Sequence, residues 1–396
     1  MQLFLLIPVF FYKKQLNKHM EDYLKLFEIT SDYEEYIDGD DALLPNVSYC
    51  EDENKVHFNP IPPDTRVVAK FGVTSTTSPV NIIDGGSTTA FTEIEIDGVV
   101  QPSVVSTYTF NTTGEHVVKY ALVDATTISD AAFYDCDFTS VTIPDSVTSI
   151  GNSAFAACVN LTSLTIPDSV TSIGNTAFHY CGSLTSVTIP DSVTSIGKRA
   201  FSSCSGLTNV TIPDSVTSIG DEAFSGCSAI TEIYYNAQVG LTLFSEGWGQ
   251  NLEKAVIGDA TPSIGANVFN NCSGLTSVTI GNSVASIGNY AFGTCSSLTS
   301  ITIPDSVTTI NTGAFYGCSG LANATIGSGV TVIYDNAFSN CSNLGSITSL
   351  ATTGPSLYGF SVFGVKANGT LYVPAGSTNY DRWMSSLGSG WTKVEQ

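Results

Sequence analysis

Cysteine residues recur at a nearly constant interval along this chain of 396 residues. Nine of the ten cysteines are separated by 22 or 23 residues, apart from one gap of 45 residues. A fixed period of this length is the signature of a repeat architecture, in which each unit packs on its sequence neighbours. The gap equals two repeats, so one repeat has lost its cysteine near Gly249 or Gln250 and has kept the register. The nine residues are Cys136, Cys158, Cys181, Cys204, Cys227, Cys272, Cys295, Cys318 and Cys341.

One typical repeat shows why such units stack. Val187 and Ile189 lie two positions apart, so one face of a short strand points inward, while Ser186 and Thr188 point outward. After a Pro-Asp-Ser turn, a second extended piece over 193–196 returns apolar residues to the core. The Ala-Phe-x-x-Cys segment that follows has helical spacing, which predicts one turn of α- or 3₁₀-helix. One unit cannot bury its own apolar stripe, but stacked units can, with strands about 4.8 Å apart.

The charge balance limits the partners of the chain. Its net charge is −22, from 14 Lys and Arg against 36 Asp and Glu. Long-range repulsion by this charge excludes nucleic acid and anionic lipid headgroups as partners. Charged residues make up only 13% of the chain, so Ser, Thr, Asn and Gly must cover much of the surface.

The first 63 residues read as a leader followed by an acidic tether or docking segment. The apolar run from Met1 to Tyr12 is too short to span a bilayer. It also lacks the basic start and the small-residue cleavage site of a secretion signal. We therefore expect no membrane insertion, and we expect Met20 to be the true start. The residues that follow are acidic, aperiodic and interrupted by prolines.

Residues 64–124 show short alternating runs, which predict a small antiparallel β-sandwich that acts as a spacer. Asp97-Gly98 and Thr113-Gly114 have the composition of hairpin turns. The run from Tyr108 to Tyr120 resembles the closing hairpin of bacterial Ig-like or PKD-like spacer domains.

The repeat unit L-x-x-V-x-I-P-x-S-V-x-x-I-G-x-x-A-F-x-x-C resembles the BspA-like, or Treponema-type, leucine-rich repeat over residues 125–350. Residues 351–396, which include the run Gly369–Ser377 with Tyr380 and Trp383, look like the cap that closes such arrays. The expected fold is mostly β with short helical turns: a leucine-rich repeat solenoid preceded by a small Ig-like or PKD-like β-sandwich. The resemblance implies a surface or secreted protein that adheres to host proteins or other cells, and related arrays resemble modules of phage tail tips.

The repeated cysteines are expected to form a ladder of buried thiols. Free cysteine is readily buried, and neighbouring strands hold Cβ atoms farther apart than the ~3.8 Å of a disulfide. Disulfides between adjacent turns are the alternative, but an odd number of cysteines in the array argues against full pairing. Each repeat supplies one thiol and no partner histidine, so we expect no metal and no cofactor. Cys50, outside the array, is the thiol most open to reaction.

His179, two residues before Cys181, suggests a Cys/His nucleophile pair. It occupies a variable position, however, which holds Ala156, Ser202 and Ser225 in other repeats. The chain has no G-x-S-x-G, glycine-rich phosphate loop, H-E-x-x-H or paired-carboxylate motif. We expect no catalytic residue and no enzyme activity.

The outward face of the first strand carries columns of hydroxyl residues. Hydroxyl residues with a β-branch favour strands and keep the surface soluble. The functional interpretation is a flat surface that hydrogen-bonds a glycan or a polypeptide; an ice-binding threonine array is a third possibility. A separate column of turn carboxylates could bind calcium, although solvated turn residues are the simpler reading. The threonines are Thr142, Thr165, Thr188, Thr211, Thr279, Thr302, Thr325 and Thr348, and the carboxylates are Asp145, Asp168, Asp191, Asp214 and Asp305.

Two degenerate repeats interrupt the threonine column. There the threonine becomes Tyr234 and Val256, the neighbouring serine becomes Glu232 and Lys254, and Trp248 lies in an irregular segment. An exposed aromatic side chain beside charges is typical of a recognition hot spot or a sugar-stacking platform. A repacked core at a worn repeat is the alternative. The candidate ligand-binding residues are Glu232, Tyr234, Trp248, Lys254, Ser186, Thr188 and Thr211.

These patterns together predict a non-enzymatic recognition protein. The expected partner is a host or cell-surface protein or glycan, and a phage tail-tip adhesin is one version of this role. The alternative is a structural spacer or surface-coat protein without a dedicated ligand.

Overall fold

The structure is a computed structural model, which describes residues 5–6, 47–50, 55–58, 65–83, 87–242, 251–359, 361–364 and 368–396. It divides into two units, Met1–Asp64 and Thr65–Gln396. The described residues of the first unit form a three-stranded antiparallel sheet in the order β1-β3-β2. Its strands are β1 (Leu5–Leu6), β2 (Val47–Cys50) and β3 (Lys55–Phe58). The rest of the expected leader and acidic tether lies outside the described residues.

The second unit begins with antiparallel strands in the order β7-β6-β9-β4, and β5 pairs separately with β8. The predicted Asp97-Gly98 turn is confirmed: it joins β6 to β7, with φ values of 47° and 80°. The hairpin predicted at Thr113-Gly114 does not form, because β4 and β6 occupy both edges of β9 and β8 pairs with β5 instead. The elements are β4 (Val67–Val73), β5 (Val80–Asn81), η2 (Thr88–Ala90), β6 (Phe91–Ile96), β7 (Val99–Val100), β8 (Thr107–Tyr108) and β9 (Gly114–Leu122).

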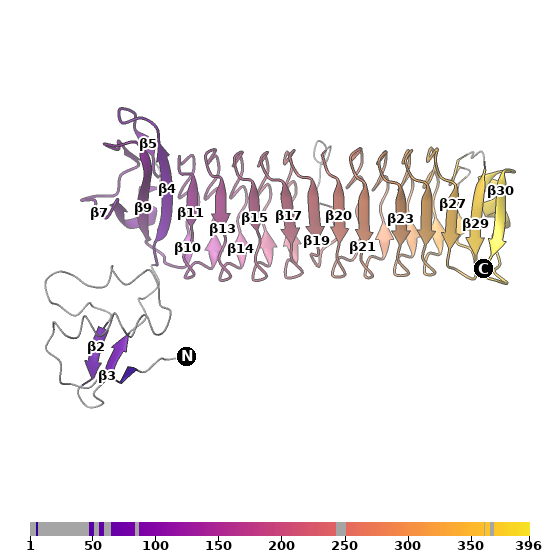
Figure 1. Cartoon of the computed structure of the whole chain (residues 1–396), viewed down its shortest axis with the longest axis horizontal. Coiled ribbons are helices and arrows are strands. Elements are labelled where there is room, and N and C mark those ends of the chain that lie inside the picture. The colour runs from indigo at the N-terminus through magenta and orange to yellow at the C-terminus, as the bar shows by residue number, and fades with distance from the viewer. Residues whose placement is uncertain are drawn as a thin grey trace. The chain divides into compact units, whose positions relative to one another are not determined.

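These strands are continuous with the repeat array. Strand β4 pairs antiparallel with β11 (Ser140–Thr142), the front strand of the first coil, with Ala69 opposite Val141. One sheet therefore runs in the order β7-β6-β9-β4-β11-β13-β15-β17-β19-β20-β21, and we call it the front sheet. The boundary expected between residues 124 and 125 lies in the turn that follows β9, and the front sheet continues across it from β4 to β11. Figure 1 shows β4 directly beside β11 and the later coils following in sequence order.

Each coil contributes one front strand, and most coils add a second, two-residue strand. These strands pair in parallel with those of the next coil, except that the front sheet ends at β21 and the later front strands form a separate sheet in the order β23-β25-β27-β29-β30. The further front strands are β13 (Ser163–Thr165), β15 (Ser186–Thr188), β17 (Asn209–Ile212), β19 (Glu232–Tyr235), β20 (Lys254–Ile257), β21 (Ser277–Ile280), β23 (Ser300–Ile303), β25 (Asn323–Ile326), β27 (Ser346–Ser349), β29 (Gly369–Val373) and β30 (Trp391–Glu395). The second strands are β10 (Thr127–Ile128), β12 (Ser149–Ile150), β14 (Ser172–Ile173), β16 (Ser195–Ile196), β18 (Ser218–Ile219), β22 (Ser286–Ile287), β24 (Thr309–Ile310), β26 (Val332–Ile333) and β28 (Ser356–Leu357).

The Ala-Phe-x-x-Cys segment forms consecutive turns and does not continue into the expected helical turn. Hydrogen bonds of the 3₁₀ type are present, such as Ser202 N–H to the Arg199 carbonyl (3.1 Å). A helix does not follow because Arg199 and Ser203 adopt positive φ (54° and 63°). The alternation points every second N–H at the next coil, as in Phe201 N–H to the Ala223 carbonyl (2.8 Å). These turns thus add another ladder of hydrogen bonds between coils.

The interior is a set of columns that run through the coils. Phenylalanine rings of successive coils stack in parallel, as Phe155 and Phe178 do at 5.3 Å between centroids. The nine repeat cysteines are buried and form no disulfide, which confirms the predicted thiol ladder. Most of the thiols donate to the phenylalanine carbonyl of the preceding coil, as Cys181 does to Phe155 (3.2 Å). Each buried phenylalanine contributes about 1.5–3 kcal/mol through removal of its surface from water.

The last coils are closed by α2 (Asp381–Leu387), whose Trp383 and Leu387 are buried. The Trp383 indole donates to the Pro355 carbonyl (2.9 Å), and the Tyr380 hydroxyl bonds the Ala351 carbonyl (2.7 Å). These contacts anchor the chain terminus on the final coil. Among the described residues, no helix has the length and apolar character needed to cross a membrane.

Candidate binding surface

The outward side chains of the front sheet form one surface, which we call the front face. Strand pairing places Ser186 beside Asn209, then Glu232 and then Lys254, in one row. A second row runs through Thr188, Thr211, Tyr234 and Val256. Six of the seven predicted ligand-binding residues therefore lie together on strands β15, β17, β19 and β20. Trp248, the seventh, lies outside the described residues.

The inward residues of the same strands hold these side chains in place. Val187, Val210, Ile233 and Ala255 are all buried in the core. Because side chains alternate along a strand, each inward anchor forces its neighbours to point outward. A register slip of one residue would exchange the two faces, so burial of the anchors fixes the front face.

Tyr234 is the aromatic side chain that projects from the second row. Its side chain is 42% exposed, whereas the adjacent Tyr235 is fully buried and donates its hydroxyl to the Val239 carbonyl (3.0 Å). Burial raises the pKa of the Tyr235 phenol well above its usual value. The two adjacent tyrosines thus have different roles: Tyr235 belongs to the core, and Tyr234 exposes an aromatic ring and its hydroxyl group to solvent.

Glu232 and Lys254 form an ion pair on adjacent strands, with 3.3 Å between the carboxylate and the ammonium. Both side chains are about half exposed, so the pair stabilises the fold by at most about 1 kcal/mol. Its carboxylate and ammonium remain accessible beside Tyr234, which leaves them available to a partner.

The stretch from β11 to β17 carries no charged residue on the front face; we call it the hydroxyl strip. None of its hydroxyl groups makes a hydrogen bond to another described residue. The neighbouring threonine columns differ: Thr185 donates to Thr162 (3.4 Å) and Thr194 donates to Thr171 (3.1 Å) in the preceding coil. Some threonines therefore join the coils, whereas those of the strip are free to bind. The strip comprises Ser140, Thr142, Ser163, Thr165, Ser186, Thr188, Asn209 and Thr211.

Sequence reasoning missed the charged groups at the other end of the strip. Lys70 on β4 lies beside Ser140, and its ammonium pairs with Glu115 on β9 (2.9 Å). Lys119 and Glu95 extend this charged region over the next strands (3.9 Å). The alternating pattern of these strands was visible, but no sequence signal places β4 beside β11. From β4 to β19 the strip and its charged borders span about 24 Å, at about 4.8 Å per strand.

The catalytic alternative at His179 is not supported by the geometry. The His179 ring contacts Tyr180 (4.0 Å between centroids), and its Nδ1 faces the Ser202 carbonyl (2.9 Å). The Cys181 thiol instead points into the core and donates to Phe155. The described parts of the chain contain no group of three potential metal ligands, so the aspartate column forms no cluster.

Comparison with known proteins identifies a family whose repeat matches this chain. The family model of the BspA type leucine rich repeat region matches residues 126–247 and 243–354, with six copies, which is more than half of the chain. No curated protein matches. A leucine-rich repeat protein from Bacteroides ovatus is 24% identical, with 68% of this chain and 76% of that chain covered and a TM-score of 0.46.

Two further solved structures are similar. A leucine rich cell surface protein from Faecalibacterium prausnitzii is 29% identical, with 58% of this chain and 79% of that chain covered and a TM-score of 0.30. The pneumococcal vaccine antigen PcpA is 18% identical, with coverage of 68% and 76% and a TM-score of 0.37. The repeat unit, its register and the match to the family model agree, and the chain belongs to the BspA-type leucine-rich repeat family.

Proposed function

We propose that this protein is a non-enzymatic recognition protein of a cell or virion surface, which adheres through the front face to a host or cell-surface protein or glycan. The observation that carries the proposal is the contrast between threonine columns. The hydroxyls of the hydroxyl strip have no partner among the described residues, whereas equivalent residues in neighbouring columns, such as Thr194, bond the preceding coil.

The chemistry of the strip suits a polar, neutral ligand. A hydroxyl group both donates and accepts hydrogen bonds, so it can pair with sugar hydroxyls or with the amides of an extended peptide. The strip itself adds nothing to the net charge of −22, and it would not repel an anionic cell surface more than the rest of the protein does.

Tyr234 is the expected centre of the binding energy. Tyrosine is enriched in hot spots, because its ring buries a large area at a small cost in conformational entropy. The exposed ring stands at the end of the strip, beside the Glu232–Lys254 pair. Ligand contacts there would combine stacking on the ring with hydrogen bonds to Thr188 and Thr211.

Binding to a glycan microarray and to a panel of host matrix proteins tests this function. Tyr234→Ala and the double substitution Thr188→Val with Thr211→Val should each weaken binding about tenfold or more. Trp248→Ala tests the predicted residue that lies outside the described part of the chain. Tyr180→Ala is the matched control, because Tyr180 is 57% exposed but belongs to a turn outside the front sheet.

Two outcomes would contradict the proposal. Binding that survives both front-face variants would place recognition elsewhere on the molecule. No ligand on either panel, together with unchanged folding after removal of whole repeats, would instead favour the structural spacer or surface coat.

A further inference from the structure

A second surface lies near the C-terminal end of the array, away from the strands of the front face. In most coils the residue after the second strand is glycine, as at Gly197, where an added Cβ would lie 2.5 Å from the Asn175 backbone nitrogen. The last coils carry Tyr334 and Tyr358 at this position, and both donate their N–H to the isoleucine carbonyl of the preceding coil, as Gly197 does. A position that holds glycine in most coils thus carries two aromatic residues here.

The two tyrosines form an exposed aromatic pair. Their ring centroids are 5.5 Å apart, with 30° between the ring planes. The side chains of Tyr334 and Tyr358 remain 38% and 55% exposed, so they present a large aromatic area to solvent. Rings of this kind stack against the apolar face of a ring-shaped ligand, while the hydroxyl groups stay hydrated.

Arg382 supplies a positive charge next to this pair. Its guanidinium donates to the carbonyl of Gly359, the residue after Tyr358 (3.2 Å). Of the Lys and Arg side chains described from residue 65 onward, only Lys198 and Arg382 form no ion pair with a carboxylate. A guanidinium has five N–H donors, and Gly359 accepts from one nitrogen, so a fork of donors remains for a ligand.

Arg382 also lines a small hollow. It is lined by Pro355, Ser356, Leu357, Asn379 and Arg382 and has a volume of about 90 Å³. This volume corresponds to about three water molecules at ~30 Å³ each. It therefore has room for a carboxylate or a hydroxymethyl group.

We propose that Tyr334, Tyr358 and Arg382 bind a carboxylated sugar, such as a sialic or uronic acid residue of a glycan. The carboxylate enters the hollow and pairs with the Arg382 guanidinium, for which a planar fork of donors is the matching geometry. The sugar ring then lies against the exposed tyrosines. Charge complementarity selects this ligand class over neutral sugars, because the other two arginines, Arg66 and Arg199, each pair with a glutamate, whereas Arg382 forms no ion pair in the described structure.

Two carboxylates lie near Arg382, and neither forms an ion pair with it in the described structure: Asp335 lies beside Gly359, and its oxygens bond neutral donors. Asp335 Oδ1 accepts the Ser361 N–H (3.1 Å) and Oδ2 accepts the Asn336 amide (2.9 Å). Asp381 precedes Arg382 but forms no ion pair with it in the described structure. The overall negative charge opposes an anionic ligand at long range, and physiological salt screens this repulsion beyond about 8 Å.

A microarray with paired oligosaccharides tests the site. Each pair contains a carboxylated form and its neutral counterpart: sialyllactose with lactose, and oligogalacturonate with oligogalactose. The intact protein should bind at least one carboxylated member, with its neutral partner about tenfold weaker or more. Arg382→Gln should remove this preference, and Tyr358→Ala should weaken binding of the carboxylated member.

Matched controls separate this site from general charge effects and from the front face. Lys198→Gln removes the other cation that has no ion pair among the side chains described from residue 65 onward, and Tyr180→Ala removes an exposed tyrosine of another coil; both should bind like the unaltered protein. Tyr234→Ala should also leave this binding unchanged, so the proposal stands or falls separately from the proposed function. Equal binding of charged and neutral members, no binding to any carboxylated member, or equal loss in Lys198→Gln would each overturn it.

Discussion

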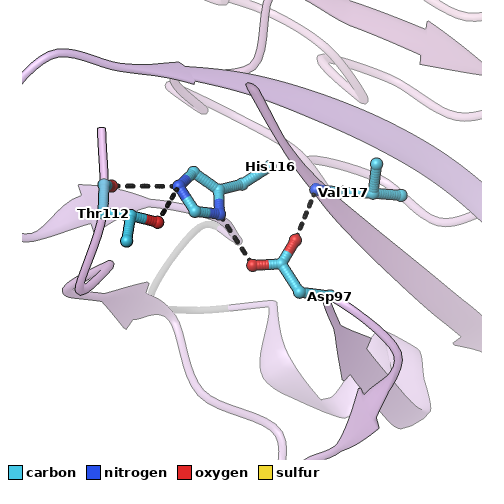
Figure 2. A network of polar contacts seen from close by, with 4 residues as sticks. All are labelled: Asp97, Thr112, His116 and Val117. Carbon is cyan, nitrogen blue, oxygen red and sulfur yellow. Dashed lines mark hydrogen bonds and ion pairs between the residues drawn. The ribbon is translucent and has the colours of Figure 1, made fainter. Parts of the chain in front are cut away.

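The imidazole of His116 and the carboxylate of Asp97 are joined by a contact of 2.7 Å between Nδ1 and Oδ2 (Figure 2). The other oxygen of Asp97 accepts the Val117 N–H (2.9 Å), and His116 Nε2 faces the Thr112 carbonyl (3.0 Å). Both ring nitrogens thus face acceptors, which an imidazolium satisfies best. The network ties strand β9 to the turn between β6 and β7.

Stability should depend on pH through this histidine. Burial lowers the pKa of His116, but its hydrogen bonds to Asp97 and Thr112 and the charge of Asp97 outweigh burial, so the pKa lies above its ordinary value of 6.5. A raised pKa in the folded state means that the stabilisation is complete below about pH 6.5 and is lost as the pH rises through the folded-state pKa. We expect Tm to fall by about 1–3 °C over this rise in pH, and His116→Gln to lack this step. Thermal unfolding of the unaltered protein and of His116→Gln from pH 5 to 9 measures this change in Tm. The same dependence of Tm on pH in both proteins would refute the role of His116.

The repeat thiols should be inert in the folded protein. Burial raises the pKa of the Cys227 thiol to about 12 and that of Cys272 to about 12, so almost no thiolate of these two exists at pH 8. Cys181 differs, because hydrogen bonds with the thiols of Cys158 and Cys204 lower its pKa, but its complete burial keeps a reagent away from the sulfur. Because the thiolate is the reactive form, a thiol reagent such as DTNB should leave the repeat cysteines unmodified until denaturant is added. Absorbance during the reaction counts the modified thiols. A Cys50→Ser variant removes the cysteine outside the array, and rapid labelling of that variant under native conditions would contradict the prediction.

Cys204→Ala should destabilise the array. The Cys204 thiol donates to the buried Phe178 carbonyl (3.1 Å), and alanine leaves this carbonyl without the bond and adds a small cavity. The expected loss in the free energy of unfolding is about 1–3 kcal/mol. Denaturant unfolding followed by circular dichroism measures the change. An unaltered midpoint would show that the thiol fills space without bonding.

Two threonine substitutions should separate folding from binding. Thr194→Val removes the hydroxyl that bonds the Thr171 carbonyl (3.1 Å), and it should lower the free energy of unfolding by about 1 kcal/mol. Thr188→Val removes a hydroxyl with no partner in the described structure, so stability should hardly change while ligand binding weakens. Denaturant titration and a binding assay on both variants give the two readouts. The same loss of stability in both variants would mean that the front-face hydroxyl also supports the fold.

Much of the array follows from the sequence because its coils obey one local rule. The two-residue alternation in Ser186-Val187-Thr188 predicts which side chains face outward, and the fixed period carries that register into every later coil. The same alternation places Tyr234 outside and Tyr235 inside. The cysteine column could be predicted from two facts alone: the period of the repeat, and the small volume of a thiol next to phenylalanine.

Features that depend on distant pairing could not be predicted. Ala69 and Val141 lie on adjacent strands, yet nothing in their local sequences specifies this antiparallel contact. The turns of the array also escaped prediction, because residues with side chains, such as Arg199, adopt the positive φ that favours glycine. Arg382 and Tyr358 meet only through packing of α2 on the final coil.

The pairing of β4 with β11 gives the last prediction. An uncovered β11 would expose a row of unpaired N–H and C=O groups, which is a template for association with another chain. A truncated protein that begins at residue 125 should therefore self-associate and unfold at a lower temperature than a protein that begins at residue 65. Light scattering after size-exclusion chromatography compares the two. A monomeric and equally stable truncated protein would show that the first coil protects its own edge, and that β4 with its antiparallel partners serves another purpose.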